Sequence, residues 1–308
     1  MLRYTFERIL YMIITLFIIA SLTFFLMKLL PGSPLKNQEK LSPEQVQLIN
    51  QKYGLDKPLP VQYIRYLSNL AKGDLGFSFQ YDNRTVTQLI SDRIGPSAQL
   101  GFQALIVGSI LGLLLGILAA IKHNTIFDYG ATVLSVLGIS IPAFVFAGFL
   151  QYFLGVKLEL LPVALWEGFT YTIMPTIALS GFVIANISRF MRTELIEVMN
   201  SDYIMLAKAK GISQRGIIYK HAVRNALIPV ITIIGPLAVN IMVGSLVIER
   251  IFGIPGLGEQ FVRSITMNDY TVIMGTTIFY SALFVLIIFV VDVLYGIVDP
   301  RIRLSVKR

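Results

Sequence analysis

Six long apolar runs, separated by polar segments, set the pattern of this chain. Each run has few or no charged residues and reaches the roughly 20 residues with which a helix crosses the hydrocarbon core of a bilayer. The runs cover residues 9–27, 97–121, 129–156, 168–188, 226–248 and 271–291. This pattern predicts an all-α membrane protein with six transmembrane helices.

The first run has an alternative interpretation as a secretory signal peptide, because Arg3 and Arg8 precede it. The run is longer than the apolar core of a typical signal peptide, and no Ala-x-Ala cleavage site follows it. These features favour a retained helix with its N-terminus on the basic side.

The polar segment 31–96 predicts a small helical insertion between the first two spans. Ser42 and Pro43 are typical of an N-cap and a first helical position, and Gly54 is expected to end that helix. A second helix is expected after Pro60, with Gly73 beyond its end. Its predicted apolar face consists of Val61, Ile64, Leu67 and Leu70.

A third short helix is expected from Val86, where Leu89 and Ile90 share its apolar face, and Gly95 with Pro96 is expected to break it. The insertion either covers the outer ends of the bundle or helps to dock an extracytoplasmic binding protein. The chain then divides into residues 1–30 with the first span, the extracytoplasmic segment 31–96, and a core domain 97–308.

Residues 200–229 are polar and basic, yet they are patterned like a folded structure. Asn200, Ser201 and Asp202 offer N-cap oxygens, Gly211 supplies a C-terminal stop, and Ser213 can cap a second helix. The first helix would carry Tyr203, Leu206, Ala207 and Lys210 along one face. The second would turn Ile217, Ile218, Ala222 and Val223 inward.

The predicted product is a helix, a glycine turn and a helix, which we call the elbow (residues 200–229). It lies within the predicted cytoplasmic loop 189–225 and its continuation into the next span. From periodicity alone the elbow is either an amphipathic connector on lipid headgroups or a docking site for another protein.

Composition supports the membrane prediction, since 55% of residues are hydrophobic, 14% are charged and the mean hydropathy is +0.70. The formal net charge of +8 does not indicate nucleic-acid binding, because the basic residues alternate with the spans and form no patch interleaved with aromatics. Most Lys and Arg of the short connections fall on one side. This asymmetry predicts that both termini and the elbow are cytoplasmic.

Catalytic motifs are missing from the sequence. No Gly-Lys dipeptide occurs, so the chain has no phosphate-binding P-loop, and any ATP must be hydrolysed by a partner. His123 and His221 are the only histidines and lie in no zinc motif, and there is no cysteine. The predicted spans hold almost no ionisable residues, which argues against a proton pump or a carboxylate-driven secondary transporter.

Four polar side chains lie deepest in the predicted spans: Gln103, Gln151, Asn186 and Asn240. They are candidates for lining a neutral, water-filled path. The alternative is that they hydrogen-bond between helices, for about 0.6 kcal/mol each.

Glycine and proline mark further features of the spans. Gly108, Gly112 and Gly116 recur every four residues and predict a stripe on which another helix packs closely. Prolines in or near spans are expected to kink or unwind them. These prolines are Pro142, Pro175, Pro229 and Pro236.

Several separated motifs resemble the peptide-permease branch of ABC importers, and most closely the B-type membrane subunit of oligopeptide permeases. The matching segments are 29–34, 53–63, 73–76, 252–258, 292–295 and 299–301, and, in the elbow, Asp202-Tyr203, 207–211, His221, 224–227 and Pro229. Two departures are visible. Ser33 replaces an Asp, and Met205 and Leu206 stand where the general importer pattern has Glu and Ala.

This resemblance implies the type I ABC importer permease fold and a coupling helix in the elbow that docks in a cleft of an ATPase subunit. The residues implied in coupling are Asp202, Tyr203, Leu206, Ala207, Ala209, Lys210, Gly211, His221 and Arg224. The chain itself would be a non-catalytic subunit that binds no cofactor and no metal.

The implied partners are a paralogous permease subunit, two ABC ATPase subunits that use ATP and Mg, an extracytoplasmic peptide-binding protein, and the lipid of a bacterial plasma (inner) membrane. Oligopeptides are the implied substrate, and permeases for dipeptides, nickel or glutathione have similar sequences. A passive channel and an intramembrane enzyme are the alternatives from other classes. The channel predicts flux without ATP, and the enzyme predicts turnover by the purified chain.

Overall fold

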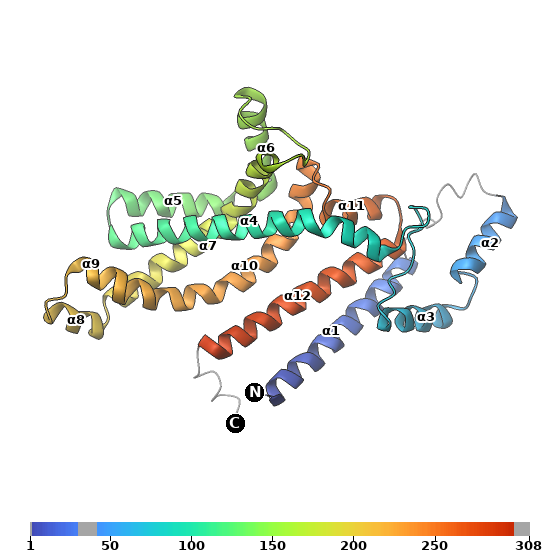
Figure 1. Cartoon of the computed structure of the whole chain (residues 1–308), viewed down its shortest axis with the longest axis horizontal. Helices are drawn as coiled ribbons and strands as arrows, with labels where there is room; N and C mark the ends of the chain where they lie inside the picture. Colours follow the sequence, from blue (N-terminus) through green and yellow to red (C-terminus); the bar gives the residue numbers. More distant parts are fainter. Residues whose placement is uncertain (1, 30–41, 299–308) are drawn as a thin grey trace. The chain divides into compact units, whose positions relative to one another are not determined.

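The computed structural model describes residues 2–29 and 42–298 of the 308-residue chain. Regular structure in this part is helical (Figure 1), and its one pairing of extended residues is an isolated antiparallel bridge between Phe77 and Thr85. The predicted all-α class is therefore confirmed. The motif at 299–301 and residues 30–34 of the motif at 29–34 lie outside the described residues.

Five described helices are long and apolar enough to cross a membrane, and a bent helix pair brings the number of spans to six if it counts as one. The five correspond to five of the six predicted runs and extend beyond most of them, because helices continue past the apolar boundary into polar sequence. They are α1 (Leu2–Leu29), α4 (Val86–Ile121), α7 (Phe169–Met199), α10 (Val223–Phe252) and α12 (Tyr270–Val298).

The bent pair occupies the predicted span 129–156, in which Pro142 is expected to kink or unwind the helix. Helix α5 (Ile126–Ser140) and helix α6 (Ala143–Leu150), which continues as the π-helical segment η2 (Gln151–Lys157), meet at an angle of 105°. Ile141 is extended, because the ring of Pro142 disfavours helical geometry in the residue before it. Pro142 thus breaks the helix, as expected, whereas Pro175, Pro229 and Pro236 lie inside helices.

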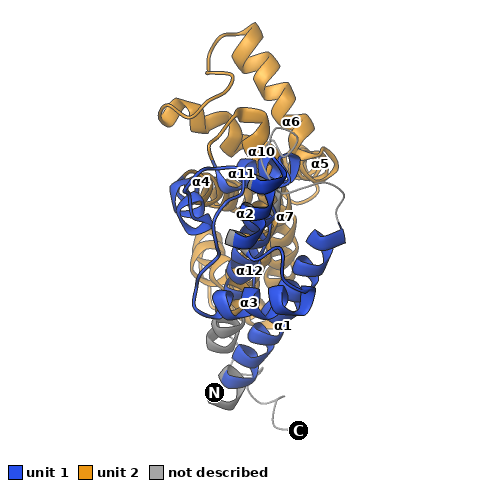
Figure 2. Ribbon diagram, turned by 90° about the vertical axis from the view of Figure 1, so that its right-hand side faces the viewer, with its two compact units in different colours: residues 1–95, 256–286 blue, residues 96–255, 287–308 orange. Residues whose placement is uncertain are grey.

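The chain separates into two compact units, coloured in Figure 2. Unit 1 comprises residues 1–95 and 256–286, and unit 2 comprises residues 96–255 and 287–308.

In unit 1 the insertion contains helix α2 (Pro43–Tyr53) and helix α3 (Leu59–Ala71), both of them predicted. Gly54 and Gly73 follow these helices with φ of 68° and 77°, a left-handed conformation that glycine adopts without strain. The two predicted helices and their glycine stops are confirmed.

The predicted inner face of α3 is wrong in part, because Ile64 is 66% exposed. Tyr63 and Tyr66 instead pack on Phe24 of α1. The ring centroid of Phe24 is 5.3 Å from that of Tyr63 and 5.4 Å from that of Tyr66. Aromatic rings bury more apolar surface than Val or Ile, and they decide the orientation of the helix. Burial, and then the neighbouring Tyr63, raises the pKa of Tyr66 to about 12, so the phenol remains neutral.

The predicted break at Gly95-Pro96 is also wrong, since α4 runs through both residues as one 36-residue helix. Proline removes one backbone hydrogen bond from the helix interior. The cost of that loss is small beside the burial of Val86, Leu89 and Ile90 before the proline and of Leu100 after it.

A buried carboxylate ties the loop before α4 to the start of α12. Asp269 accepts hydrogen bonds from the Ser78 hydroxyl and from the backbone N–H groups of Phe79 at 3.2 Å and Gln80 at 3.3 Å. Helix α11 (Leu257–Thr266) adds Leu257 to the small apolar core of this unit.

Unit 2 is built around α7, against which α5, α6 and α10 pack. The predicted glycine stripe of α4 also lies on α7. A Cβ added at Gly108 would be 2.6 Å from Val183 Cβ, one at Gly112 would be 2.9 Å from Ile187 Cβ, and one at Gly116 would be 2.6 Å from the Ser188 carbonyl oxygen. The three glycines therefore permit the close approach of two helices, and the packing prediction is confirmed.

Candidate functional site

The elbow begins with the short helix α8 (Asp202–Ala209). Ser201 is its extended N-cap residue, and the carbonyl oxygen of Ser201 accepts from the N–H groups of Ile204 and Met205, both at 3.1 Å. The Ser201 hydroxyl does not cap α8, since it donates to the Val198 carbonyl at 2.6 Å. The side chain of Ser201 thus bonds to the last turn of α7, while its backbone carbonyl accepts the first hydrogen bonds of α8.

Gly211 ends α8 in the predicted way. Its φ is 76°, its N–H donates to the Lys208 carbonyl at 3.0 Å, and the next N–H, of Ile212, donates to the Ala207 carbonyl at 3.3 Å. This pair of bonds is the Schellman motif, in which a left-handed residue satisfies the last carbonyls of a helix. The turn of the elbow therefore depends on the backbone freedom of one glycine.

The second part of the elbow starts at Ser213, whose hydroxyl accepts from the Gly216 N–H at 3.3 Å. One helical turn, α9 (Gln214–Gly216), passes into the π-helical segment η3 (Ile217–Ala222) and then directly into α10. Ile217, Ile218 and Ala222 are buried, as predicted. The elbow is therefore continuous with a membrane-length helix rather than joined to it by a loop.

Apolar contacts fix one side of α8 and leave the other exposed. Ile204 and Ala207 are buried in the core of unit 2, together with Leu195 from the end of α7 and Ile217 from η3. The residues predicted to share one face of α8 therefore differ in burial. Ala207 is buried, whereas Tyr203 and Leu206 are 43% and 57% exposed. Met205 is 65% exposed. These three exposed side chains, Tyr203, Met205 and Leu206, form the ridge of the elbow.

A hydrogen bond joins the ridge to the membrane-length helix α10. Asn225 Nδ2 donates to Tyr203 Oη at 3.0 Å. Asp202, Ala209, Lys210 and Arg224 are exposed and His221 is partly buried, so these predicted residues lie on or near the outer surface of the elbow. Helical periodicity gives no role to Asn225 or to Met205. The role of Asn225 is visible only in its hydrogen bond to Tyr203, and that of Met205 only in its exposure.

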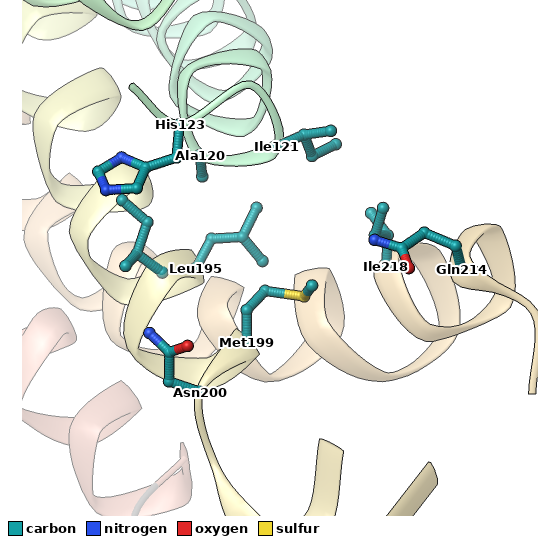
Figure 3. Close-up of a pocket in the computed structure, with 9 residues that line it drawn as sticks. Ala120, Ile121, His123, Leu195, Met199, Asn200, Gln214 and Ile218 are labelled. Atoms are coloured by element: carbon teal, nitrogen blue, oxygen red, sulfur yellow. The ribbon is translucent and has the colours of Figure 1, made fainter. Parts of the chain in front are cut away.

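A pocket of about 170 Å³ lies behind the elbow (Figure 3). His123 and Ala120 line it from the end of α4, Leu195 and Met199 from the end of α7, and Gln214 from α9. The pocket separates the turn after α4 from the second part of the elbow. Among the described residues no cluster of three or more His, Asp or Glu side chains has the geometry of a metal site.

The four predicted path residues do not converge on one site. Gln103 Oε1 accepts from Thr176 Oγ1 at 3.3 Å between α4 and α7, and Gln151 Nε2 donates to the carbonyls of Val163 at 2.9 Å and Ile251 at 3.2 Å. Asn186 Nδ2 donates within its own helix at 2.8 Å, to the Phe182 carbonyl. Asn240 is exposed. Gln103 and Gln151 thus fit the alternative interpretation, in which polar side chains hold helices together.

Comparison with known families gives two matches. Residues 112–304 match the family described as binding-protein-dependent transport system inner membrane component, and residues 1–100 match the N-terminal region of membrane components of such systems.

Related proteins are similar over the full chain. The dipeptide transport system permease protein DppB of Lactococcus lactis subsp. cremoris is 48% identical, covering 99% of this chain and 100% of the relative. DppB of Bacillus subtilis is 46% identical over 100% of both chains. The oligopeptide transport system permease protein OppB of Escherichia coli is 42% identical, covering 98% of this chain and 100% of its own.

Among solved structures, the crystal structure of an amino acid ABC transporter with histidines has a TM-score of 0.54 at 14% identity, covering 68% of this chain and 93% of that one. At this identity the likeness shows the fold alone, which is that of type I ABC importer permeases, as predicted. The chain belongs to the family of binding-protein-dependent transport system inner membrane components.

Proposed function

We propose that this chain is one of two membrane subunits of an ATP-driven peptide importer and that the ridge of the elbow docks in an ATPase subunit. The observation that carries the proposal is the ridge itself. Three large exposed side chains, Tyr203, Met205 and Leu206, stand on a short helix that buried Ile204 and Ala207 hold from behind. Such a ridge fits a cleft in a partner protein and can transmit force, because its base cannot shift independently of α7.

The chemistry of the ridge favours a protein partner over lipid headgroups. The side chains of the ridge are apolar or aromatic, and the same elbow carries four exposed cations, Lys208, Lys210, Arg215 and Lys220. No ion pair among the described residues neutralises these four. An apolar centre with a polar rim is the usual anatomy of a protein interface, and the cations suit acidic residues around a cleft.

The mechanism is alternating access. Binding of ATP and Mg by the partner subunits draws them together, α8 carries the displacement into α7 and α10, and the helices open toward the extracytoplasmic side to accept peptide from a binding protein. Hydrolysis and release return the helices to their first arrangement. In this scheme the chain is a non-catalytic subunit with both termini and the elbow in the cytoplasm, as the distribution of Lys and Arg predicts.

The names of the relatives support peptides as the substrate class, and they include both dipeptide and oligopeptide permeases. Proteoliposomes that contain this chain, a second membrane subunit, ATPase subunits and a binding protein should take up labelled dialanine or labelled pentaalanine. We expect uptake to require ATP and the binding protein. Comparison of the two peptides decides between dipeptide and oligopeptide transport.

Two outcomes would contradict the proposal, and each points to another class of protein. Peptide flux through the membrane subunits without ATP would indicate a passive channel. Turnover of a peptide by the purified chain would indicate an enzyme.

A further inference from the structure

A charged cluster of Asp128, Arg192 and His123 joins helices that are far apart in the sequence. Arg192 of α7 binds the Asp128 carboxylate through two nitrogens, with Nε 2.5 Å from Oδ1 and Nη2 2.8 Å from Oδ2. The side chain of Asp128, in the first turn of α5, is 2% exposed. A bidentate pair of this kind fixes both the distance and the orientation of the two helices.

The same carboxylate also fixes the turn between α4 and α5. Oδ2 of Asp128 accepts from the Asn124 N–H at 2.9 Å and lies 3.0 Å from His123 Nδ1. Asn124 has a φ of 60°, so this turn has a defined left-handed residue. One buried carboxylate therefore holds the end of α4, the start of α5 and the last part of α7 together.

The last part of α7 is also the base of the elbow. Arg192 precedes the end of α7 by about two helical turns, and Leu195 between them is buried in the same core as Ile204 and Ala207 of α8. The pocket in Figure 3 separates the turn after α4 from Gln214 and Ile218 of the elbow. The elbow contacts α7 through η3, and α5 packs on α7, so α7 connects the two. The charged cluster fixes α5 to the part of α7 next to the elbow.

Helix α5 is placed to follow a movement of the end of α7. It is held at its first turn by Asp128 and ends at the 105° break around Pro142. Apolar contacts allow two helices to slide slightly past each other, whereas a bidentate ion pair resists that sliding. Helices α5 and α7 also pack against each other elsewhere, and the ion pair fixes their relative position near the base of the elbow, so α5 is expected to follow movement of the end of α7.

We propose that Asp128 and Arg192 are positioning residues that fix α5 to the base of the elbow, so that force received by the ridge reaches the bent pair of α5 and α6. This inference rests on the proposed function. It predicts that loss of the pair separates ATP hydrolysis from peptide uptake rather than abolishing both.

The test uses the complete transporter in proteoliposomes, with peptide uptake and ATP hydrolysis measured on the same preparation. In Asp128→Asn and in Arg192→Gln we expect peptide uptake per ATP hydrolysed to fall about tenfold, within the range by which residues of a coupling network alter it. The rate of ATP hydrolysis should stay within about twofold of the unaltered protein. The reversed pair Asp128→Arg with Arg192→Asp should recover part of the ratio, because it restores the attraction.

The matched control is Arg189→Gln, which removes the same charge from an exposed position one turn earlier on α7. It should leave the ratio unchanged. Uptake and hydrolysis that fall in parallel in the Asp128 and Arg192 variants would indicate a merely structural pair and would overturn the inference. An unchanged ratio in those variants would overturn it as well.

A second measurement tests the inference in a protein that keeps both Asp128 and Arg192. The chain has no cysteine, so spin labels can be placed on introduced cysteines at exposed Val133 of α5 and exposed Lys220 of η3. With the pair intact, we expect one narrow distance that is the same with and without ATP, and in Arg192→Lys a distribution that broadens on addition of ATP. A distance that changes with ATP in the intact pair would show that α5 does not follow the elbow.

The two proposals fail in different ways. Absence of ATP-dependent peptide uptake by the unaltered transporter would contradict the proposed function. Coupled uptake by the unaltered transporter, with the same ratio in the Asp128 and Arg192 variants, would contradict only the role of the pair.

Discussion

Replacing Gly211 with valine is expected to reduce peptide uptake by about tenfold while the assembled transporter continues to hydrolyse ATP. Gly211 has a φ of 76°, and a left-handed residue other than glycine costs about 1–2 kcal/mol, with β-branched residues at the upper end. A Cβ at Gly211 would meet nothing within 4 Å, so the cost comes from the backbone and not from a clash. The strain acts on the two hydrogen bonds that end α8, and it changes how the ridge is presented.

The control for this prediction is Gly211→Asn, since asparagine tolerates the left-handed region better than other side chains. It should keep most of the uptake. The measurement is uptake per ATP hydrolysed in proteoliposomes, together with binding of peptide to the isolated binding protein, which neither variant should change. Normal uptake by Gly211→Val would exclude a role for the glycine turn in coupling.

Replacing Gly116 with leucine is expected to destabilise unit 2 strongly. A Cβ at this position would lie 2.6 Å from the Ser188 carbonyl oxygen and 2.8 Å from Met191 Cβ, closer than real Cβ contacts allow. The remaining atoms of leucine must then push α4 and α7 apart. Overpacking of this kind costs about 1–3 kcal/mol and occasionally more. We expect the upper end, because a backbone atom cannot move aside as the tip of a side chain can.

The matched control is Gly148→Leu, a helical glycine whose added Cβ would meet nothing within 4 Å. The yield of folded protein and its thermal stability in detergent measure both variants. Gly116→Leu should lower the midpoint of thermal unfolding by several degrees or abolish the folded fraction, and Gly148→Leu should do neither. Equal stability of the two variants would show that the stripe does not determine the packing of α4 on α7.

The features that the sequence predicts well are those whose physical cause is local. Gly211 is recognisable because only a residue without Cβ adopts its φ readily, and the repeat of Gly108, Gly112 and Gly116 is recognisable because helical periodicity puts the three on one face. The apolar runs predict the spans because a helix needs about 20 consecutive apolar residues to cross the hydrocarbon core.

The effect of a proline on its helix could not be predicted from the local sequence. Pro96 and Pro142 have the same backbone chemistry, yet α4 continues through Pro96 and the third span breaks at Pro142. Buried apolar residues on both sides of Pro96 compensate for its lost hydrogen bond. The difference depends on tertiary packing, which the pattern of one segment does not contain.

Contacts between distant segments could not be predicted from a single sequence. Asp128 and Arg192 are 64 residues apart, and each alone is an ordinary charged residue near the end of an apolar run. Asn225 and Tyr203 meet only because α8 folds back beside α10. The orientation of α3 likewise depends on Phe24 of another helix, which its own periodicity does not reveal.

If a separate ATPase subunit acts on this chain through the ridge of the elbow, a crosslinker placed on the ridge should reach that subunit. Because the chain has no cysteine, a single cysteine at exposed Leu206 can carry a photocrosslinker in the complete transporter, with a cysteine at exposed Val133 as the control. We expect the label at Leu206 to capture the ATP-hydrolysing subunit from the cytoplasmic side and the label at Val133 not to capture it. Failure of Leu206 to capture that subunit, or its modification by a membrane-impermeant thiol reagent from outside the cell, would contradict the account.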